Sequence, residues 1–127
     1  MTTSFNSAVA GMAKAVQGSR GVSVTYLRGG DALPLTAVPA EDRYLADDGH
    51  GLLQQQFVRD YLLLAADLDF GAGPAEPQRG DRIKEAFGDT VKVYEVVALG
   101  GEPHWRYCDS GHQELRIHTK LIATEPA

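Results

Sequence analysis

The residues QELRIHTKLIA at positions 113–123 have the strictest two-residue alternation in the chain. Successive side chains of a β-strand point to opposite sides, so apolar or small residues at every second position predict a strand with one buried face. The residues that follow, 124–127, are expected to fray. The predicted inner face is Leu115, Ile117, Thr119 and Leu121, and the predicted solvated face is Glu114, Arg116, His118 and Lys120.

Short stretches of the same character precede this strand, and turn formers separate them. Gly88-Asp89 and Asp109-Ser110-Gly111 are predicted to be tight turns. In the stretch 90–99 one face is expected to carry Val91, Val93, Val97 and Leu99, interrupted by Glu95. The other predicted strands are 22–28, 53–66, 82–87 and one beginning at 104–107, with at most one short strand at 33–38.

The stretch 53–66, LQQQFVRDYLLLAA, is ambiguous between strand and helix because leucine and alanine also favour helices. Its second half is apolar on both faces, which is typical of a central or barrel strand, and we interpret it as one. One face would carry Phe57, Arg59, Tyr61 and Leu63, and the other Val58, Asp60, Leu62 and Leu64.

The N-terminal stretch 4–17 has helical spacing instead. Ser4 is a plausible N-cap, and Gly18 and Gly21 end the element. Gly11 weakens such a helix by about 1 kcal/mol relative to alanine, so it needs a surface to pack against. That surface is either the domain's own core or a neighbouring subunit. The apolar stripe consists of Phe5, Val9, Met12 and Val16.

These elements predict a mainly β (α+β) fold, a small antiparallel β-barrel or strongly bent sheet with an N-terminal helix. The length of 127 residues indicates a single domain over 1–127. Within it, residues 22–123 would form the barrel, with a long acidic loop at about 29–52. A parallel α/β fold is excluded, since it would need several more helices.

Composition excludes several classes of protein. Twelve basic and seventeen acidic residues give a net charge of -5, the wrong sign for a protein that coats nucleic acid. The single cysteine, Cys108, excludes an intrachain disulfide. No apolar run reaches the roughly 18 residues that cross a bilayer, and the start lacks the pattern of a secretory signal. The expected setting is a reducing cytoplasm.

A metal site and a catalytic site are both disfavoured, and no cofactor motif is recognised. His104, Cys108, His112 and His118 form a run with ligand-like spacing, but cations flank His118 on its predicted solvated face. We therefore expect surface histidines and no metal. The carboxylates of Asp47-Asp48, Asp67 and Asp69 are expected to be solvated, and Cys108 to be a packing residue. The sequence lacks a nucleophile elbow, a phosphate-binding loop and a zinc-protease motif.

Two short motifs call for separate interpretation. Arg79-Gly80-Asp81 spells an integrin-binding tripeptide, but it is expected to be the tight turn that leads into strand 82–87. Trp105 and Arg106 are residue types that anchor protein interfaces, so they are candidates for a subunit contact. Burial of Trp105 in the core is the alternative.

The second half of the chain resembles the head–tail joining proteins of long-tailed phages, also called head-completion or stopper proteins, and their prophage and gene-transfer-agent relatives. That family has an N-terminal helical segment before a compact β-barrel. The resemblance in layout spans residues 4–122. The letters that carry it are PQRGDRI at 77–83, VYEVVALGGEPHWRYCD at 93–109 and LRIHTK at 115–120.

The resemblance implies a structural virion protein of the phage neck. Such proteins form a homo-oligomeric ring, usually of six or twelve copies, below the portal or adaptor protein. The ring closes the filled head and gives a docking surface to a tail terminator or tail-tube protein. DNA would pass through the channel without specific binding, no membrane is involved, and assembly would take place in the host cytoplasm. The alternatives are a tail terminator or other neck ring component, and a small β-barrel ligand-binding module or enzyme.

The segment 31–51 holds five carboxylates and one arginine, a net charge of -4 out of the chain's -5. It is either an ordinary solvated loop or a loop that projects toward the axis of the ring. In the second case its carboxylates would repel DNA phosphates. The residues proposed to face the channel are Glu41, Asp42, Asp47 and Asp48.

Overall fold

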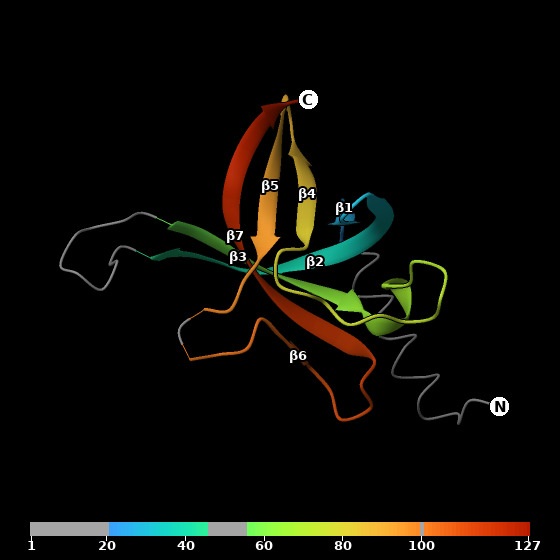
Figure 1. The fold of residues 1–127 in the computed structure, drawn as a ribbon. Coiled ribbons are helices and arrows are strands. Elements are labelled where there is room, and N and C mark those ends of the chain that lie inside the picture. The colour runs from blue at the N-terminus through green and yellow to red at the C-terminus, as the bar shows by residue number, and fades with distance from the viewer. Residues whose placement is uncertain (1–20, 46–55, 100) are drawn as a thin grey trace.

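The structure, a computed structural model, describes residues 21–45, 56–99 and 101–127, with the backbone alone described at 41–45 and 56–57. The helix predicted over 4–17 lies outside these residues. The described part contains seven strands and one short 3-10 helix (Figure 1). They are β1 (Val22–Arg28), β2 (Asp31–Leu45), β3 (Gln56–Leu64), η1 (Ala65–Asp67), β4 (Arg82–Phe87), β5 (Thr90–Val96), β6 (Trp105–Tyr107) and β7 (Glu114–Pro126).

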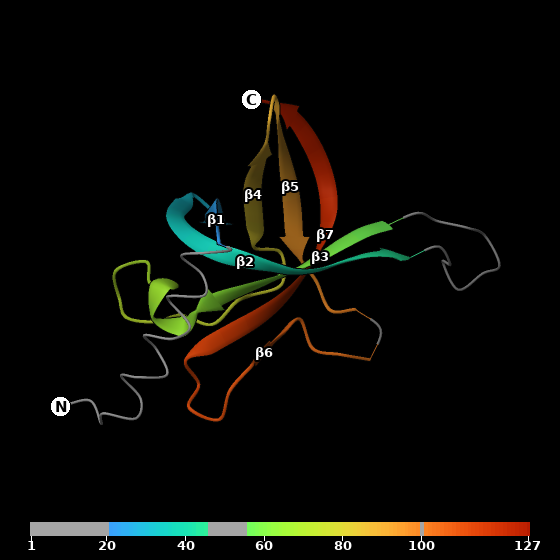
Figure 2. The ribbon, with the colours of Figure 1, turned by 180° about the vertical axis from the view of Figure 1, so that it is seen from behind.

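Six of the described strands close into an antiparallel barrel. The order is β3-β2-β1-β4-β5-β7, and β3 pairs back with β7 to complete the circuit (Figure 2). The short strand β6 adds to the edge of β7 outside this circuit. The prediction of a mainly β fold built on a small antiparallel barrel is confirmed.

Strand β7 is long enough to serve two neighbours, which allows the barrel to close. Its residues 114–120 pair with β3, and 119–126 pair with β5. The two pairings overlap only at Thr119 and Lys120, so β7 crosses the barrel steeply from one end to the other. Strand β6 pairs with 115–117, on the same edge of β7 that β5 occupies further along.

The core lies inside the barrel and follows the alternation that the sequence predicts for β7. Leu115, Ile117 and Thr119 are fully buried, and Leu121 packs against the core from its rim. In β3 both faces are buried, as expected of a barrel strand, and the strand interpretation of this segment is confirmed. The buried core cluster consists of Val24, Tyr26, Ala37, Tyr61, Leu63, Leu68, Ile83, Tyr94, Val96, Leu115 and Ile117.

The predicted common face of Val91, Val93, Val97 and Leu99 is wrong, because β5 ends before Val97. Tyr94 and Val96 join the core cluster, while Val93 is buried outside it and β5 ends at Val96. A register shift opposite Val93 and Tyr94 leaves Ile122 of β7 as an extra residue, a β-bulge. Because valines occupy both faces of this stretch, its sequence does not indicate which face turns toward the core. The residues paired with it across the sheet decide this.

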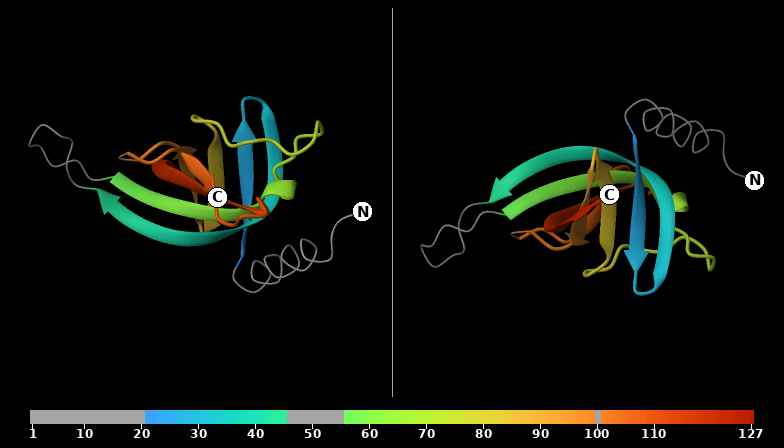
Figure 3. Two further views of the ribbon diagram at one scale, coloured as in Figure 1. Left: turned by 90° about the horizontal axis from the view of Figure 1, so that it is seen from below. Right: turned by 90° about the horizontal axis from the view of Figure 1, so that it is seen from above.

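The predicted loop at 29–52 is wrong over 31–45, because these residues form β2. Its backbone pairs with β1 over 31–37 and with β3 over 38–45, and these hydrogen bonds hold an acidic, proline-containing segment in a strand. A bulge between Pro39 and Glu41 relieves the ladder near one proline. Beyond the barrel, the end of β2 and the start of β3 pair only with each other and project outward as an arm (Figure 3).

The tail predicted to fray is instead the end of β7. Thr124, Glu125 and Pro126 pair with Lys92, Val91 and Thr90 of β5, and the amide of Ala127 donates to the Asp89 carbonyl at 2.8 Å. The predicted Gly88-Asp89 turn is confirmed, since Phe87 and Thr90 pair across it and Gly88 has a φ of 60°.

One end of the barrel interior contains a buried ion pair. Arg59 Nε lies 3.2 Å from Glu85 Oε1, and the Tyr61 hydroxyl donates to the same oxygen at 2.6 Å. The Arg59 guanidinium also lies over the rings of Tyr61 and Phe87, 5.5 and 5.3 Å from their centroids. Burial and the neighbouring Glu85 carboxylate raise the pKa of Tyr61, so its hydroxyl remains a donor. The charges are therefore matched inside the barrel.

We predict that Glu85→Gln lowers the free energy of unfolding by about 3 kcal/mol, because it removes the buried negative charge that Arg59 Nε and the Tyr61 hydroxyl share. Tyr61→Phe should cost about 1–2 kcal/mol, the value of one buried hydrogen bond. The control is Glu125→Gln, which breaks the exposed Lys84–Glu125 pair at 3.3 Å and should change stability by less than about 0.5 kcal/mol. Denaturant unfolding measures all three, and equal effects of the Glu85 and Glu125 variants would contradict this account.

Candidate interaction surface

Strand β6 presents one of the predicted anchors to solvent and turns the other inward. Arg106 is exposed, whereas Trp105 and Tyr107 are half-buried and pack against the core. The rings of Trp105 and Tyr107 meet edge to face, with centroids 5.0 Å apart. Of the two alternatives for Trp105, the structure thus favours packing against the core, and Arg106 is the side chain free to contact a partner.

The turn after β6 is fixed by its own side chains, as predicted for 109–111. The His112 amide donates to the Asp109 carbonyl at 3.2 Å, and the Asp109 carboxylate accepts from the amides of Gln113 and Glu114. His112 has a φ of 55°, in the left-handed region, and its ring stacks on Tyr107 with centroids 4.0 Å apart. The exposed surface next to Arg106 is therefore ordered.

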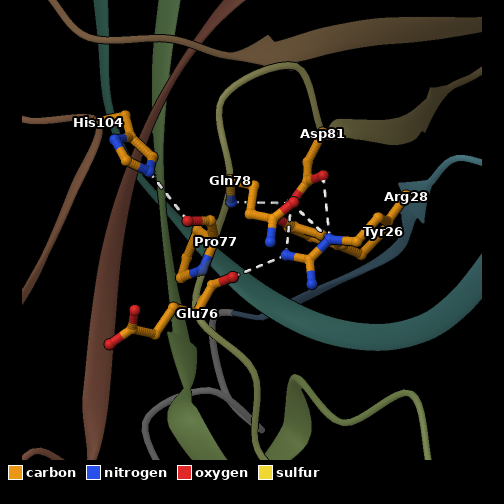
Figure 4. Close-up of polar contacts among 7 residues, drawn as sticks. All are labelled: Tyr26, Arg28, Glu76, Pro77, Gln78, Asp81 and His104. Atoms are coloured by element: carbon orange, nitrogen blue, oxygen red, sulfur yellow. Dashed lines mark hydrogen bonds and ion pairs between the residues drawn. The ribbon is translucent and has the colours of Figure 1, made fainter.

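The segment before β6 is tied to the loop before β4. His104 Nε2 lies 2.9 Å from the Pro77 carbonyl oxygen, which links the two loops across 27 positions of sequence (Figure 4). Pro77 is buried. This bond places His104 beside the loop of 76–81, and that loop is in turn held from its other end.

The loop 76–81 is held by the buried carboxylate of Asp81 (Figure 4). Asp81 accepts from the Tyr26 hydroxyl at 2.5 Å, from Arg28 Nη2 at 2.8 Å and from the Gln78 amide at 2.9 Å. Arg28 Nη2 also donates to the Glu76 carbonyl at 2.7 Å. The tripeptide 79–81 is thus a structural turn with a buried carboxylate, as predicted, and Gly80 takes a φ of 91° there.

The protonation states of Tyr26 and Arg28 follow from their contacts with Asp81. Burial raises the pKa of Tyr26, and the hydrogen bond to Asp81 raises it further, so the hydroxyl is a neutral donor. The hydrogen bond that Arg28 donates to Asp81 raises the pKa of Arg28, so the guanidinium remains charged. The cluster pairs one negative with one positive charge, which a buried site requires.

The metal-like run does not converge. His104 contacts Pro77, His112 stacks on Tyr107, and the His118 ring lies 2.8 Å from Asp60. Among the described residues no three histidine, cysteine, aspartate or glutamate side chains are grouped to hold a metal ion. The prediction of a solvated His118 is wrong. This ring is buried because the residues between β5 and β6 cover the outer face of β7.

Within the part of the chain that the structure describes, Cys108 and Asp69 have structural surroundings. Burial of the thiol and the nearby Glu114 charge raise the pKa of Cys108, although the residue as a whole is exposed, so thiolate formation is disfavoured. The Asp69 carboxylate accepts from the amides of Gly71 and Gly73 and so shapes its own loop. This is a structural role.

The remaining predicted site residues lie at or beyond the limits of the described residues. Glu41 and Asp42 belong to β2, where their backbones pair opposite Asp60 and Arg59. The residues outside the described part are Phe5, Val9, Met12, Val16, Asp47 and Asp48.

The sequence profile of one family, described as phage head-tail joining protein, matches residues 4–126. The chain belongs to this family. A comparison with curated proteins gave no match. The predicted resemblance to head–tail joining proteins is confirmed, and the match spans the barrel and every described strand.

Membership makes this joining protein a structural component of the virion, located at the phage neck and in contact with head and tail components. The family is one of structural proteins rather than enzymes. Within the described residues, no helix has the length and apolar character needed to cross a membrane.

The sequence pattern did not indicate the buried carboxylates of Asp60, Asp81 and Glu85, each of which pairs with an arginine. Asp60 is fully buried and pairs with Arg116 Nη2 at 2.7 Å. A signal for it was present, since an aspartate in the middle of an otherwise buried strand needs partners. Its partner on β7 is 56 positions away, so the identity of that partner was not readable from spacing.

We predict that Asp81→Asn destabilises the joining protein by about 2–4 kcal/mol, because Arg28 loses its counter-charge and an amide offers one acceptor in place of two. Amide exchange in residues 76–81 should accelerate at the same time. The matched control is Arg79→Ala in the same tripeptide, an exposed side chain whose removal should cost less than about 0.5 kcal/mol. Equal effects of the two substitutions would show that Asp81 does not hold this loop.

Proposed function

We propose that this joining protein forms a closed homo-oligomeric ring below the portal or adaptor protein. The ring closes the filled head and gives the tail terminator or tail-tube protein its docking surface. The observation that carries the proposal is the family match over 4–126, the whole barrel included. Head-to-tail contacts that close by rotation allow one small domain to surround a channel. Assembly in the host cytoplasm precedes incorporation into the virion.

The closed barrel limits which parts of the molecule can make contacts between copies. Each of its six strands pairs with two others, although the two pairings of a strand differ in the residues that they cover, and β6 is added at the edge of β7. Copies therefore associate mainly through side chains and through segments that project from the closed part of the barrel. Arg106 is exposed on β6 and suits this role. The apolar stripe predicted over 4–17 is the second candidate.

The β2–β3 arm supports a role for the acidic segment. The two strands pair with each other up to Leu45 and Gln56, and Gln56 and Phe57 have no partner on β7. Leu45 and Gln56, the described ends of the arm, therefore lie away from the closed part of the barrel. We propose that this end of the arm points toward the ring axis, where Glu41, Asp42, Asp47 and Asp48 of each copy repel DNA phosphates.

For the ring, we predict that Arg106→Glu and the double substitution Val9→Ser with Met12→Ser each reduce assembly into neck structures, with little change in melting temperature. Native mass spectrometry and electron microscopy of assembled particles measure the first quantity, and thermal unfolding the second. Arg79→Glu, another exposed arginine, is the control and should assemble normally. A collapsed melting temperature with normal assembly for the double variant would assign the N-terminal stripe to the monomer's own core. Particles without rotational symmetry at this protein would end the ring proposal.

For the channel, we predict that Asp47 and Asp48 lie near the axis in a reconstruction of the assembled neck. Charge repulsion is effective only within about 8–10 Å at physiological salt, so a more distant position would have no effect on DNA. Both residues on the outer rim would refute the channel role and leave the ring proposal standing.

A further inference from the structure

His118 anchors the chain where it leaves the sheet between β5 and β6. These two strands run along the same edge of β7, one after the other. Between them the chain makes an excursion (residues 97–99 and 101–104 as described), and both of its ends bond to His118. The Val97 amide donates to the His118 carbonyl at 3.0 Å, and the His118 amide donates to the His104 carbonyl at 2.9 Å. The excursion thus has the closed neck of an Ω-loop, a type of loop that is often functional.

The His118 side chain adds a third attachment. Its Nε2 lies 3.2 Å from Glu102 Oε2 of the excursion, and its Nδ1 lies 2.8 Å from Asp60 Oδ1 of β3. The ring itself is 4% exposed, so both nitrogens face protein carboxylates and not water. A buried imidazole with an acceptor at each nitrogen is an unusual demand, because only one nitrogen of the neutral ring carries a proton.

The Asp60 side of the ring is fixed. Burial raises the pKa of Asp60, but the hydrogen bonds and positive charges of His118 and Arg116 outweigh it and leave this pKa below its usual range. Asp60 is therefore an acceptor, and Nδ1 of His118 must carry a proton to donate to it. In the neutral ring Nε2 would then present a lone pair to the Glu102 carboxylate, and two acceptors repel each other. In the imidazolium form Nε2 donates to Glu102.

We propose that His118 and Glu102 form a pH-sensitive latch, which holds the excursion between β5 and β6 against β7 only while His118 carries both ring protons. Histidine is the side chain that ordinarily changes charge between pH 5 and 8. The groups that bear on this ring are Asp60 on β3, Arg116 and Lys120 on β7, and Glu102 and His104 in the excursion. Asp60 and Arg116 remain paired in both states, so the contact that changes with pH is the one to Glu102.

The latch acts locally. The Glu102 side chain is 62% exposed, and an ion pair with so exposed a partner is weak. Loss of the contact should therefore change local opening by about two- to fivefold and leave the barrel intact. Opening would free the backbone of β7 at His118, where neither β5 nor β6 reaches. The inference rests on this geometry alone and does not depend on whether the protein assembles into an oligomeric ring.

The test is NMR spectroscopy of the full chain between pH 5 and 8, with ring-nitrogen shifts of His118 and amide protection factors of Val97, Glu102 and His118. Protection factors divide out the intrinsic pH dependence of exchange. We expect protection at these three amides to fall by about two- to fivefold as the His118 ring loses its second proton. The core amides of Ile117 and Leu63 should not change over the same range.

Two variants make the test specific. Glu102→Gln changes an exposed side chain, should fold normally, and should abolish the pH dependence at the three amides. His112→Gln removes a histidine that lies outside the excursion and should leave the pH dependence as it is. The latch is refuted if protection is the same across the range. It is equally refuted if the Glu102 variant keeps the wild-type pH dependence, or if His118 keeps one protonation state throughout while protection changes.

Discussion

Two buried carboxylates, Asp81 and Glu85, determine how the barrel is held together. They stand four positions apart, Asp81 directly before β4 and Glu85 within it, and each meets a tyrosine hydroxyl and an arginine. The partners of Asp81 are on β1, next to β4, and those of Glu85 are on β3, across the barrel. A buried charge without a partner costs several kcal/mol, so each carboxylate requires the strand that carries its tyrosine and arginine to be in place. The closed barrel satisfies that requirement on both sides of the interior at once.

The same arrangement is used twice with different strands. On β1 the tyrosine and arginine are Tyr26 and Arg28, and on β3 they are Arg59 and Tyr61. A spacing of two places both side chains on the same face of a strand, where one carboxylate can reach both. Each arginine also lies over an aromatic ring, Phe70 for Arg28 and Phe87 for Arg59. The polar groups thereby connect the start of β4 to β1 and its middle to β3, while the apolar core between them supplies the burial that favours folding.

The sequence predicted the elements whose evidence is local. Alternation gave the strand and the inner face of β7, and glycine-containing turns gave the boundaries of β4 and β6. What it could not give depends on partners far away in sequence. β2 was predicted to be a loop because of its prolines and acidic residues, but its pairing with β1 and β3 outweighs these local preferences. His118 was taken for a surface residue because Asp60 and Glu102, which bury it, come from other parts of the chain. Of the candidate surface, sequence identified Arg106 and left Trp105 open.

Closure of the barrel also explains why the buried polar residues of this sequence serve the fold and give no chemical indication of function. The interior carboxylates are paired with arginines and tyrosines, and the described residues contain no group of histidine, cysteine, aspartate and glutamate side chains that could hold a metal ion. What remains for partners lies outside the circuit of six strands. It consists of the β2–β3 arm, the β6 surface with Arg106, and the excursion anchored at His118. The family implies contacts with head and tail components, and we propose that these three regions make them.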